Sequence, residues 1–135
     1  MKPGQASQTA VMVCMARAAA HGRTPVTRFA DPTALALLPD DARARVELFR
    51  AGTAPRSGRE RMERAVLEKR SAMMVARTVA IDEVVRAAGS PQLVILGAGL
   101  DGRAWRMPEL RDAVVFEVDY PASQREKQAR VAALA

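Results

Sequence analysis

Two glycines and one aspartate in the last third of the chain have the types and the spacing that bind a nucleoside. Gly97 and Gly99 directly follow an apolar run, and glycine at such a turn lets the backbone approach a ligand where a Cβ would take up the space. Asp119 follows Gly97 at close to the usual offset of roughly 20 residues between such a glycine turn and an acid that accepts hydrogen bonds from a ribose diol. The three residues therefore predict a cleft for a nucleoside-containing cofactor.

The turn itself leaves the choice of cofactor open. Read as Gly97-x-Gly99-x-x-Gly102, it is the fingerprint of dinucleotide sites, which favours NAD. Asp101 argues against NAD, because its carboxylate would meet a pyrophosphate where a helix N-terminus normally binds an anion. S-Adenosylmethionine has no phosphate and carries a sulfonium and an ammonium, so an acidic turn costs it little. Residues 1–88 also precede the first strand, whereas a simple dinucleotide domain often starts with that strand.

Apolar periodicity, helix caps and breaker residues predict the elements that must hold this turn. A cap at Asp31 and a proline in the first helical position, Pro32, start the second helix. The longest helix carries an apolar stripe that includes Met73, Ala80 and Val84. The pattern predicts helices over residues 7–20, 32–38, 41–50, 59–88, 103–110 and 121–135, and strands over residues 92–96 and 113–119.

The two predicted strands flank the turn and a short helix, which is the order of a βαβ unit with parallel strands. Residues 92–96 form a continuous apolar run between a proline and a glycine, and such a run is typical of a strand buried on both faces of a parallel sheet. We therefore expect an α/β fold in which residues 1–88 form a helical cap and residues 89–135 begin a cofactor-binding sheet.

Composition narrows the function classes. The 135 residues suffice for one domain, and 21 Lys and Arg against 15 Asp and Glu give a net charge of +6. Acids are interspersed with the bases and only 4% of residues are aromatic, so we expect no nucleic-acid partner.

The lone cysteine, Cys14, is expected in the core. A single cysteine excludes a disulfide framework or a CxxC metal or redox pair, and it favours a cytoplasmic location. No run approaches the roughly 20 apolar residues of a membrane span, so we expect no membrane partner.

Longer strings of residues carry a resemblance to a known family. Residues 92–106 read QLVILGAGLDGRAWR, residues 116–121 read FEVDYP, and Lys127 follows. Upstream, residues 29–34 read FADPTA and residues 76–78 read ART. Together the strings closely resemble the leucine carboxyl methyltransferase family, in particular its bacterial S-adenosylmethionine-dependent branch, which includes O-methyltransferases of secondary metabolism.

The resemblance implies a fold and a set of cofactor contacts. The fold would be that of a Rossmann-like class I methyltransferase, of which this chain holds a helical cap and the first βαβ unit. Gly97, Ala98 and Gly99 would line the methionine and ribose portion of S-adenosylmethionine. Asp119 would bind the ribose hydroxyls, and Arg77 would pair with the methionine carboxylate.

Arg77 has support that does not depend on the resemblance. It falls on the apolar stripe of Met73, Ala80 and Val84, where burial of an unpaired guanidinium would be costly. A carboxylate facing this fork-shaped donor would remove that cost. The alternative is that the side chain reaches solvent from the helix.

The chain departs from the family in two ways. Gly102 stands where the family usually has Thr or Ser after the acid, which loosens the turn. The family sheet has seven strands, and residues 1–135 supply the first two, so the adenine contacts, the substrate pocket and any general base would come later. No catalytic residue is therefore named. We expect an N-terminal portion that is inactive alone, unless a homo-oligomer or a swapped dimer completes the sheet.

Three functions follow from these patterns. The favoured one is S-adenosylmethionine-dependent methyl transfer to an oxygen, on a carboxylate or hydroxyl of a small metabolite. The second is half of the domain of an NAD-dependent oxidoreductase. The third is a noncatalytic dimerising or assembly module that uses its open sheet edge.

Overall fold

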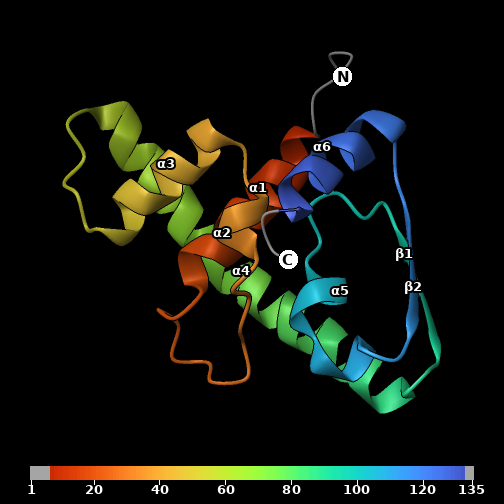
Figure 1. Cartoon of the computed structure of the whole chain (residues 1–135). Helices are drawn as coiled ribbons and strands as arrows, with labels where there is room; N and C mark the ends of the chain where they lie inside the picture. Colours follow the sequence, from red (N-terminus) through yellow and green to blue (C-terminus); the bar gives the residue numbers. More distant parts are fainter. Residues whose placement is uncertain (1–6, 133–135) are drawn as a thin grey trace.

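The computed structural model describes residues 7–132 (Figure 1). The predicted helices and strands are present in that range, except that the helix predicted over residues 103–110 is interrupted at Met107, before Pro108, and forms a short α-helix and a 3-10 helix. In chain order they are α1 (Gln8–Ala20), α2 (Ala34–Leu37), α3 (Asp40–Arg50), α4 (Gly58–Ala88), β1 (Gln92–Leu96), α5 (Arg103–Arg106), the 3-10 helix η1 (Pro108–Leu110), β2 (Val114–Val118) and α6 (Pro121–Val131). The predicted end of the last helix, residues 133–135, lies outside the described residues. The architecture is a set of helices with a small parallel sheet, compatible with the expected α/β class.

Local signals set the two ends of α4, the longest helix. The Ser57 hydroxyl accepts a hydrogen bond from the Glu60 backbone N–H at 3.1 Å, which satisfies one of the free donors of the first turn. Gly89 follows the helix with a φ of +52°, the left-handed conformation that commonly ends helices. The predicted end of this helix at residue 88 is confirmed.

A core of small and branched apolar side chains joins α1 to its neighbours. α1 packs along α4 and also contacts α2 and α3, and Figure 1 shows it in the middle of the helical part of the molecule. Cys14 is fully buried in this core, as predicted, and its thiol donates a hydrogen bond to the Ala34 carbonyl oxygen at 3.1 Å. The largest fully buried apolar side chains around it are Leu37, Leu38 and Val46.

β1 and β2 form a two-stranded parallel sheet in which Gln92 pairs with Val114 and Leu96 with Val118. Figure 1 shows the helices on one side of this sheet. The prediction that residues 92–96 are buried on both faces is wrong here, because the strand alternates between half-buried and exposed positions. An apolar run indicates that both faces suit burial, but the rest of the fold decides what covers each. The exposed apolar face of the sheet consists of Val94, Leu96, Val114, Phe116 and Val118.

The apolar stripe predicted for α4 is not its buried face. Met73 and Val84 are 58% and 68% exposed, and Ala80 is exposed as well. Apolar residues stand side by side at positions 73–75 and 79–81, so periodicity alone does not separate two helix faces about 100° apart. The residues of α4 that are buried are Met74, Val75, Thr78, Val79 and Asp82.

Candidate cofactor site

Backbone hydrogen bonds hold the turn after β1 against the end of β2. Gly97 and Ala98 donate their N–H groups to the Val118 carbonyl oxygen at 2.7 and 3.2 Å. Gly97 has a φ of +64° and Gly99 a φ of +50°, and residues with a Cβ rarely adopt this left-handed conformation. The turn therefore needs glycine at both positions for conformational reasons alone.

Asp119, which directly follows β2, lies against the same turn. Its Oδ2 accepts a hydrogen bond from the Gly99 N–H at 2.5 Å, and its Oδ1 accepts one from the Tyr120 N–H at 2.6 Å. These bonds orient the half-buried carboxylate and leave further acceptor positions on both oxygens. The structure thus brings Gly97, Ala98, Gly99 and Asp119 together, while their role in binding stays a prediction.

The two glycines differ in the space around them. A Cβ on Gly97 would meet no other atom within 4 Å, so the space beside Gly97 is open. A Cβ on Gly99 would lie 2.8 Å from the Cβ of Ala10 in α1. Gly99 is therefore needed for the close approach of α1, and the side of the turn that can accept a ligand is at Gly97.

Arg77 lies in an environment different from the one the sequence predicts. It is exposed on α4, and so are Met73, Ala80 and Val84, so the argument from the cost of burial is wrong. Within residues 7–132, the Arg77 side chain makes no hydrogen bond or ion pair, which leaves its guanidinium available. Its pairing with a cofactor carboxylate stays a prediction that rests on the resemblance.

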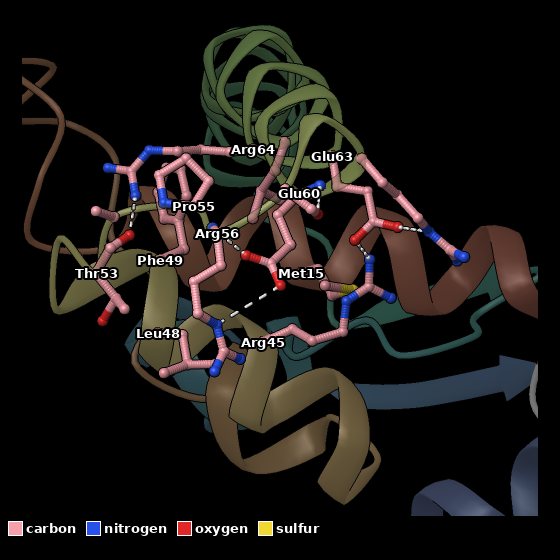
Figure 2. Close-up of a pocket in the computed structure, with 14 residues that line it drawn as sticks. Met15, Arg45, Leu48, Phe49, Thr53, Pro55, Arg56, Glu60, Glu63 and Arg64 are labelled. Atoms are coloured by element: carbon pink, nitrogen blue, oxygen red, sulfur yellow. Dashed lines mark hydrogen bonds and ion pairs between the residues drawn. The ribbon is translucent and has the colours of Figure 1, made fainter.

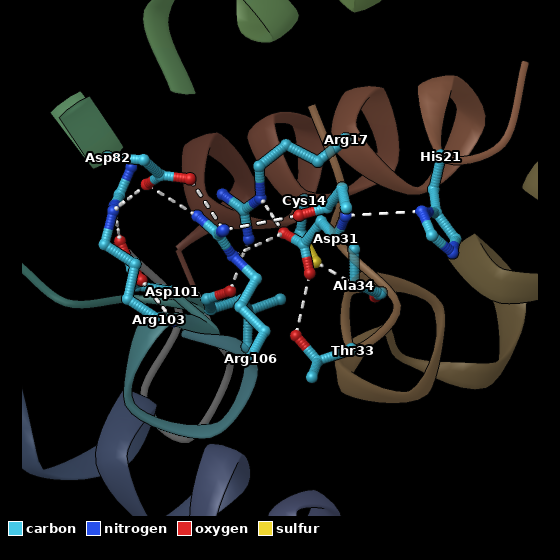
Figure 3. A network of polar contacts seen from close by, with 12 residues as sticks. Cys14, Arg17, His21, Asp31, Thr33, Ala34, Asp82, Asp101, Arg103 and Arg106 are labelled. Carbon is cyan, nitrogen blue, oxygen red and sulfur yellow. Dashed lines mark hydrogen bonds and ion pairs between the residues drawn. The ribbon is translucent and has the colours of Figure 1, made fainter. Parts of the chain in front are cut away.

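A buried ionic network connects α1 to the turn (Figure 3). Arg17 donates from Nε to Asp31 Oδ2 at 2.8 Å and from Nη2 to the Leu100 carbonyl oxygen at 2.6 Å. The Thr33 hydroxyl donates to the other Asp31 oxygen, Oδ1, at 2.8 Å. Arg17 and Asp31 are 8% and 1% exposed, so the pair is withdrawn from water. Because Leu100 directly follows Gly99, Arg17 ties the helical part of the molecule to the candidate site.

The same network continues into α4 and α5. Asp82 accepts hydrogen bonds from Arg103 Nε at 2.8 Å and from both terminal nitrogens of Arg106 at 2.7 and 2.8 Å. Burial alone would raise the pKa of Asp82, but the hydrogen bonds and charges of Arg106 and Arg103 outweigh it and hold the pKa below its ordinary value. The Asp101 carboxylate pairs with the Arg103 side chain and accepts the Arg103 N–H at 2.8 Å. Asp101 is therefore compensated locally, which weakens the charge argument against a pyrophosphate.

Sequence reasoning assigned one member of this network to another role. It predicts Asp31 as the cap of a helix that starts at Pro32, yet α2 begins at Ala34 and the Asp31 carboxylate binds Arg17 and Thr33 instead. The available signal was Arg17 itself, an arginine among alanines in an apolar helix, because such a charge needs a buried partner. The position of that partner depends on the tertiary fold.

Two further observations concern residues 7–132 as a whole. None of their His, Cys, Asp and Glu side chains gather in a group of three or more that could hold a metal ion. No helix in this range has both the length and the apolar character needed to cross a membrane.

Comparison with known proteins shows what the chain is similar to. Residues 10–135 match the family model described as leucine carboxyl methyltransferase. A protein of Mycobacterium sp. (strain KMS), named "Putative S-adenosyl-L-methionine-dependent methyltransferase", is 38% identical over 113 residues, which make up 84% of this chain and 37% of that protein. The chain thus spans little more than a third of the length of this relative.

Two further proteins with the same name match shorter segments. The protein of Mycolicibacterium gilvum (strain PYR-GCK) is 48% identical over 58 residues, or 41% of this chain and 24% of the relative. The protein of Mycobacterium tuberculosis (strain ATCC 25177 / H37Ra) is 46% identical over 61 residues, or 43% of this chain and 19% of the relative.

Proposed function

The chain belongs to the leucine carboxyl methyltransferase family, and on that premise we propose that it supplies part of the S-adenosylmethionine site of a methyltransferase. The observation that carries the proposal is an open glycine turn beside an oriented carboxylate. Gly97 has free space beside it, and Asp119 keeps acceptor positions that suit the two hydroxyls of a ribose. The parallel pairing of β1 and β2 around this turn supports a Rossmann-like sheet, of which these would be the first two strands.

Each residue of the proposed site has a separate task. Gly97 and Ala98 would let the backbone approach the methionine and ribose portion, and Asp119 would bind the ribose hydroxyls. Gly99 would act through its N–H, which orients Asp119. Arg77, a cation without a described partner, would bind the methionine carboxylate.

The proposed reaction is methyl transfer to an oxygen, on a carboxylate or hydroxyl of a small metabolite. When bound, S-adenosylmethionine supplies a methyl group activated by its sulfonium. The residues of this chain would bind and orient that cofactor, and alignment of donor and acceptor with exclusion of water contributes most to such a transfer. We propose a cytoplasmic protein, since a lone reduced cysteine fits that compartment, and no turnover by residues 1–135 alone.

Calorimetric titration with S-adenosylhomocysteine, the demethylated product, tests the site on this chain. We expect saturable binding, with NAD giving none. In Asp119→Ala the affinity should fall about 10- to 100-fold, because hydrogen bonds to a charged acceptor contribute about 1.5–3 kcal/mol. Asp119→Asn, which preserves the shape of the side chain, should show a smaller loss.

Asp112→Ala is the matched control, because Asp112 is an exposed acid just before β2 and should leave the affinity unchanged. Saturable binding of NAD alone would instead support the oxidoreductase half-domain. An unchanged affinity in Asp119→Ala would remove Asp119 from the site, and a folded sample that binds neither compound would contradict the proposal for this chain.

A further inference from the structure

A groove of about 700 Å³ lies on the helical part of the molecule, between α3, the loop over residues 51–57 and the first turns of α4 (Figure 2). Its volume falls within the range of roughly 300–1,000 Å³ that is usual for small-molecule sites. Neither the turn at Gly97 nor Asp119 lines it. The proposed methyl-transfer site therefore leaves this groove without a role.

The groove and the candidate cofactor site lie on different sides of α1. Ala10 of α1 faces Gly99, whereas Met15 of α1 lines the groove. Five residues of an α-helix advance about 7.5 Å and rotate the side chain by about 140°. A ligand in the groove would therefore occupy a second site, separated from the turn by the body of α1.

The inner wall of the groove is apolar. Met15 is buried at its base, Phe49 and Leu67 are half-buried, and Leu48 is 55% exposed. These side chains come from three helices and line the same groove. Figure 2 labels Met15, Leu48 and Phe49 among them. An aliphatic or aromatic group placed there would bind favourably, because its apolar surface would be removed from water.

The rim of the groove carries more positive than negative charge. Arg45 and Arg59 both donate to Glu63, at 3.1 and 3.0 Å, so two guanidinium groups share one carboxylate. The hydrogen bond from Arg59, together with the charges of Arg45 and Arg59, lowers the pKa of Glu63 below its ordinary value, so Glu63 stays ionised at neutral pH.

Arg64 is the cation best placed to bind a ligand. It donates a hydrogen bond to the Thr53 carbonyl oxygen at 3.1 Å and lies over the Phe49 ring, 5.1 Å from the ring centre to Cζ. Among residues 7–132 it forms no ion pair with a carboxylate, so its charge is not neutralised within the groove. A cation next to an apolar wall is complementary to a molecule that has an anionic end and an apolar body.

We propose that this groove is a second binding site, for a small amphipathic carboxylate. The carboxylate binds Arg64, and the aliphatic body lies against Leu48, Phe49 and Leu67. The site does not depend on the proposed methyl transfer, and its ligand need not be the methyl acceptor.

Decanoate, used below its micelle concentration, is the probe. When the chain is titrated with decanoate, two-dimensional NMR should show saturable shifts at the backbone amides of residues 48–67. Calorimetry should show that one equivalent of decanoate binds per chain. Decanol and decyltrimethylammonium should bind at least about tenfold more weakly, because they lack the negative charge. Arg64→Gln should weaken decanoate about tenfold and Leu48→Ser by a similar factor.

Two control variants separate this site from nonspecific binding. Arg61→Gln removes an exposed arginine of α4 that does not line the groove, and Leu96→Ser removes a 77% exposed leucine from the sheet face; both should leave the affinity for decanoate unchanged. Circular dichroism of each variant verifies that it is folded. Equal binding of decanol or of the cationic amphiphile, loss of binding in Leu96→Ser, or no saturable shift at residues 48–67 would each overturn the proposal.

Discussion

The Asp31 carboxylate lies between α1 and α5 and holds them together by charge. It accepts a hydrogen bond from Arg17 Nε at 2.8 Å, and Arg106 Nε lies 3.7 Å from the same oxygen. Around it the network contains as many carboxylates as guanidinium groups: Asp31, Asp82 and Asp101 with Arg17, Arg103 and Arg106. Removing one member of such a set leaves an uncompensated buried charge, which costs more than the pair itself contributes.

We therefore predict that Asp31→Asn lowers the free energy of unfolding by about 3 kcal/mol or more, measured by urea denaturation. Asp40→Asn is the control, since the Asp40 side chain is fully exposed and lies 3.9 Å from Arg43. It should change stability by less than about 0.5 kcal/mol. If Asp31→Asn and Asp40→Asn lowered the free energy of unfolding equally, the buried ion pairs of Asp31 would contribute no more to stability than an exposed carboxylate does.

Cys14 provides a second test of burial. Desolvation raises the pKa of its thiol to about 12, only partly opposed by the nearby charge of Arg17. The thiolate is the reactive form, so at pH 8 the native chain should not react with a disulfide reagent such as dithionitrobenzoate. In denaturant one equivalent should react. Rapid labelling of the native chain would contradict the packing of α1 against α2.

At the scale of the helices and strands, local signals predicted the ends of α4 well and its packing face poorly. Ser57 and Gly89 mark the ends of α4 through hydrogen bonding and backbone conformation, which involve only neighbouring residues. The face of α4 that is buried is decided by other elements. Adjacent methionines, Met73 and Met74, satisfy the same periodicity, so the predicted stripe was displaced from the buried face.

These two methionines predict a measurable contrast. Met74 is 6% exposed and Met73 is 58% exposed. Met74→Ala should lower the free energy of unfolding by about 2–5 kcal/mol, because it removes buried surface and leaves a cavity. Met73→Ala should change it by less than about 0.5 kcal/mol, as measured by thermal or urea unfolding. A larger loss of stability in Met73→Ala than in Met74→Ala would indicate that the apolar stripe predicted from the sequence is the buried face of α4.

In the candidate site too, positions set by local chain order could be predicted, and positions set by tertiary packing could not. Gly97, Gly99 and Asp119 could be placed from sequence because a strand, a turn and the next strand bring them together in any βαβ unit. The exposed surroundings of Arg77 could not be predicted, because the sequence argument for burial of Arg77 depended on which face of α4 is buried. The partnership of Arg17 with Leu100 joins residues far apart in the chain, and no local pattern predicts it.

At the scale of the whole molecule, the sheet is the part that the described residues leave uncovered. Val94 and Phe116 are paired across the strands and are 56% and 49% exposed. An exposed apolar patch on a sheet with unpaired edges favours association with another chain. This observation supports the third candidate function, an assembly module that dimerises through its sheet.

We predict that the average mass of the chain, measured by light scattering, rises with concentration. Val94→Lys and Phe116→Lys should each reduce this rise, because they place charge on the exposed face. Val84→Lys, at a 68% exposed position of α4, is the control and should leave the rise unchanged. A constant monomer mass over the whole range would count against association through the sheet.

The hydrogen bond between Arg17 and the Leu100 carbonyl also bears on how the molecule is made. The two residues are 83 positions apart. At synthesis rates of about 5–20 residues per second, Arg17 is added to the chain roughly 4–17 seconds before Leu100. Asp31, the other acceptor of Arg17, is only 14 residues away and is synthesised early. The network around Arg17 is therefore complete only after the glycine turn has been synthesised.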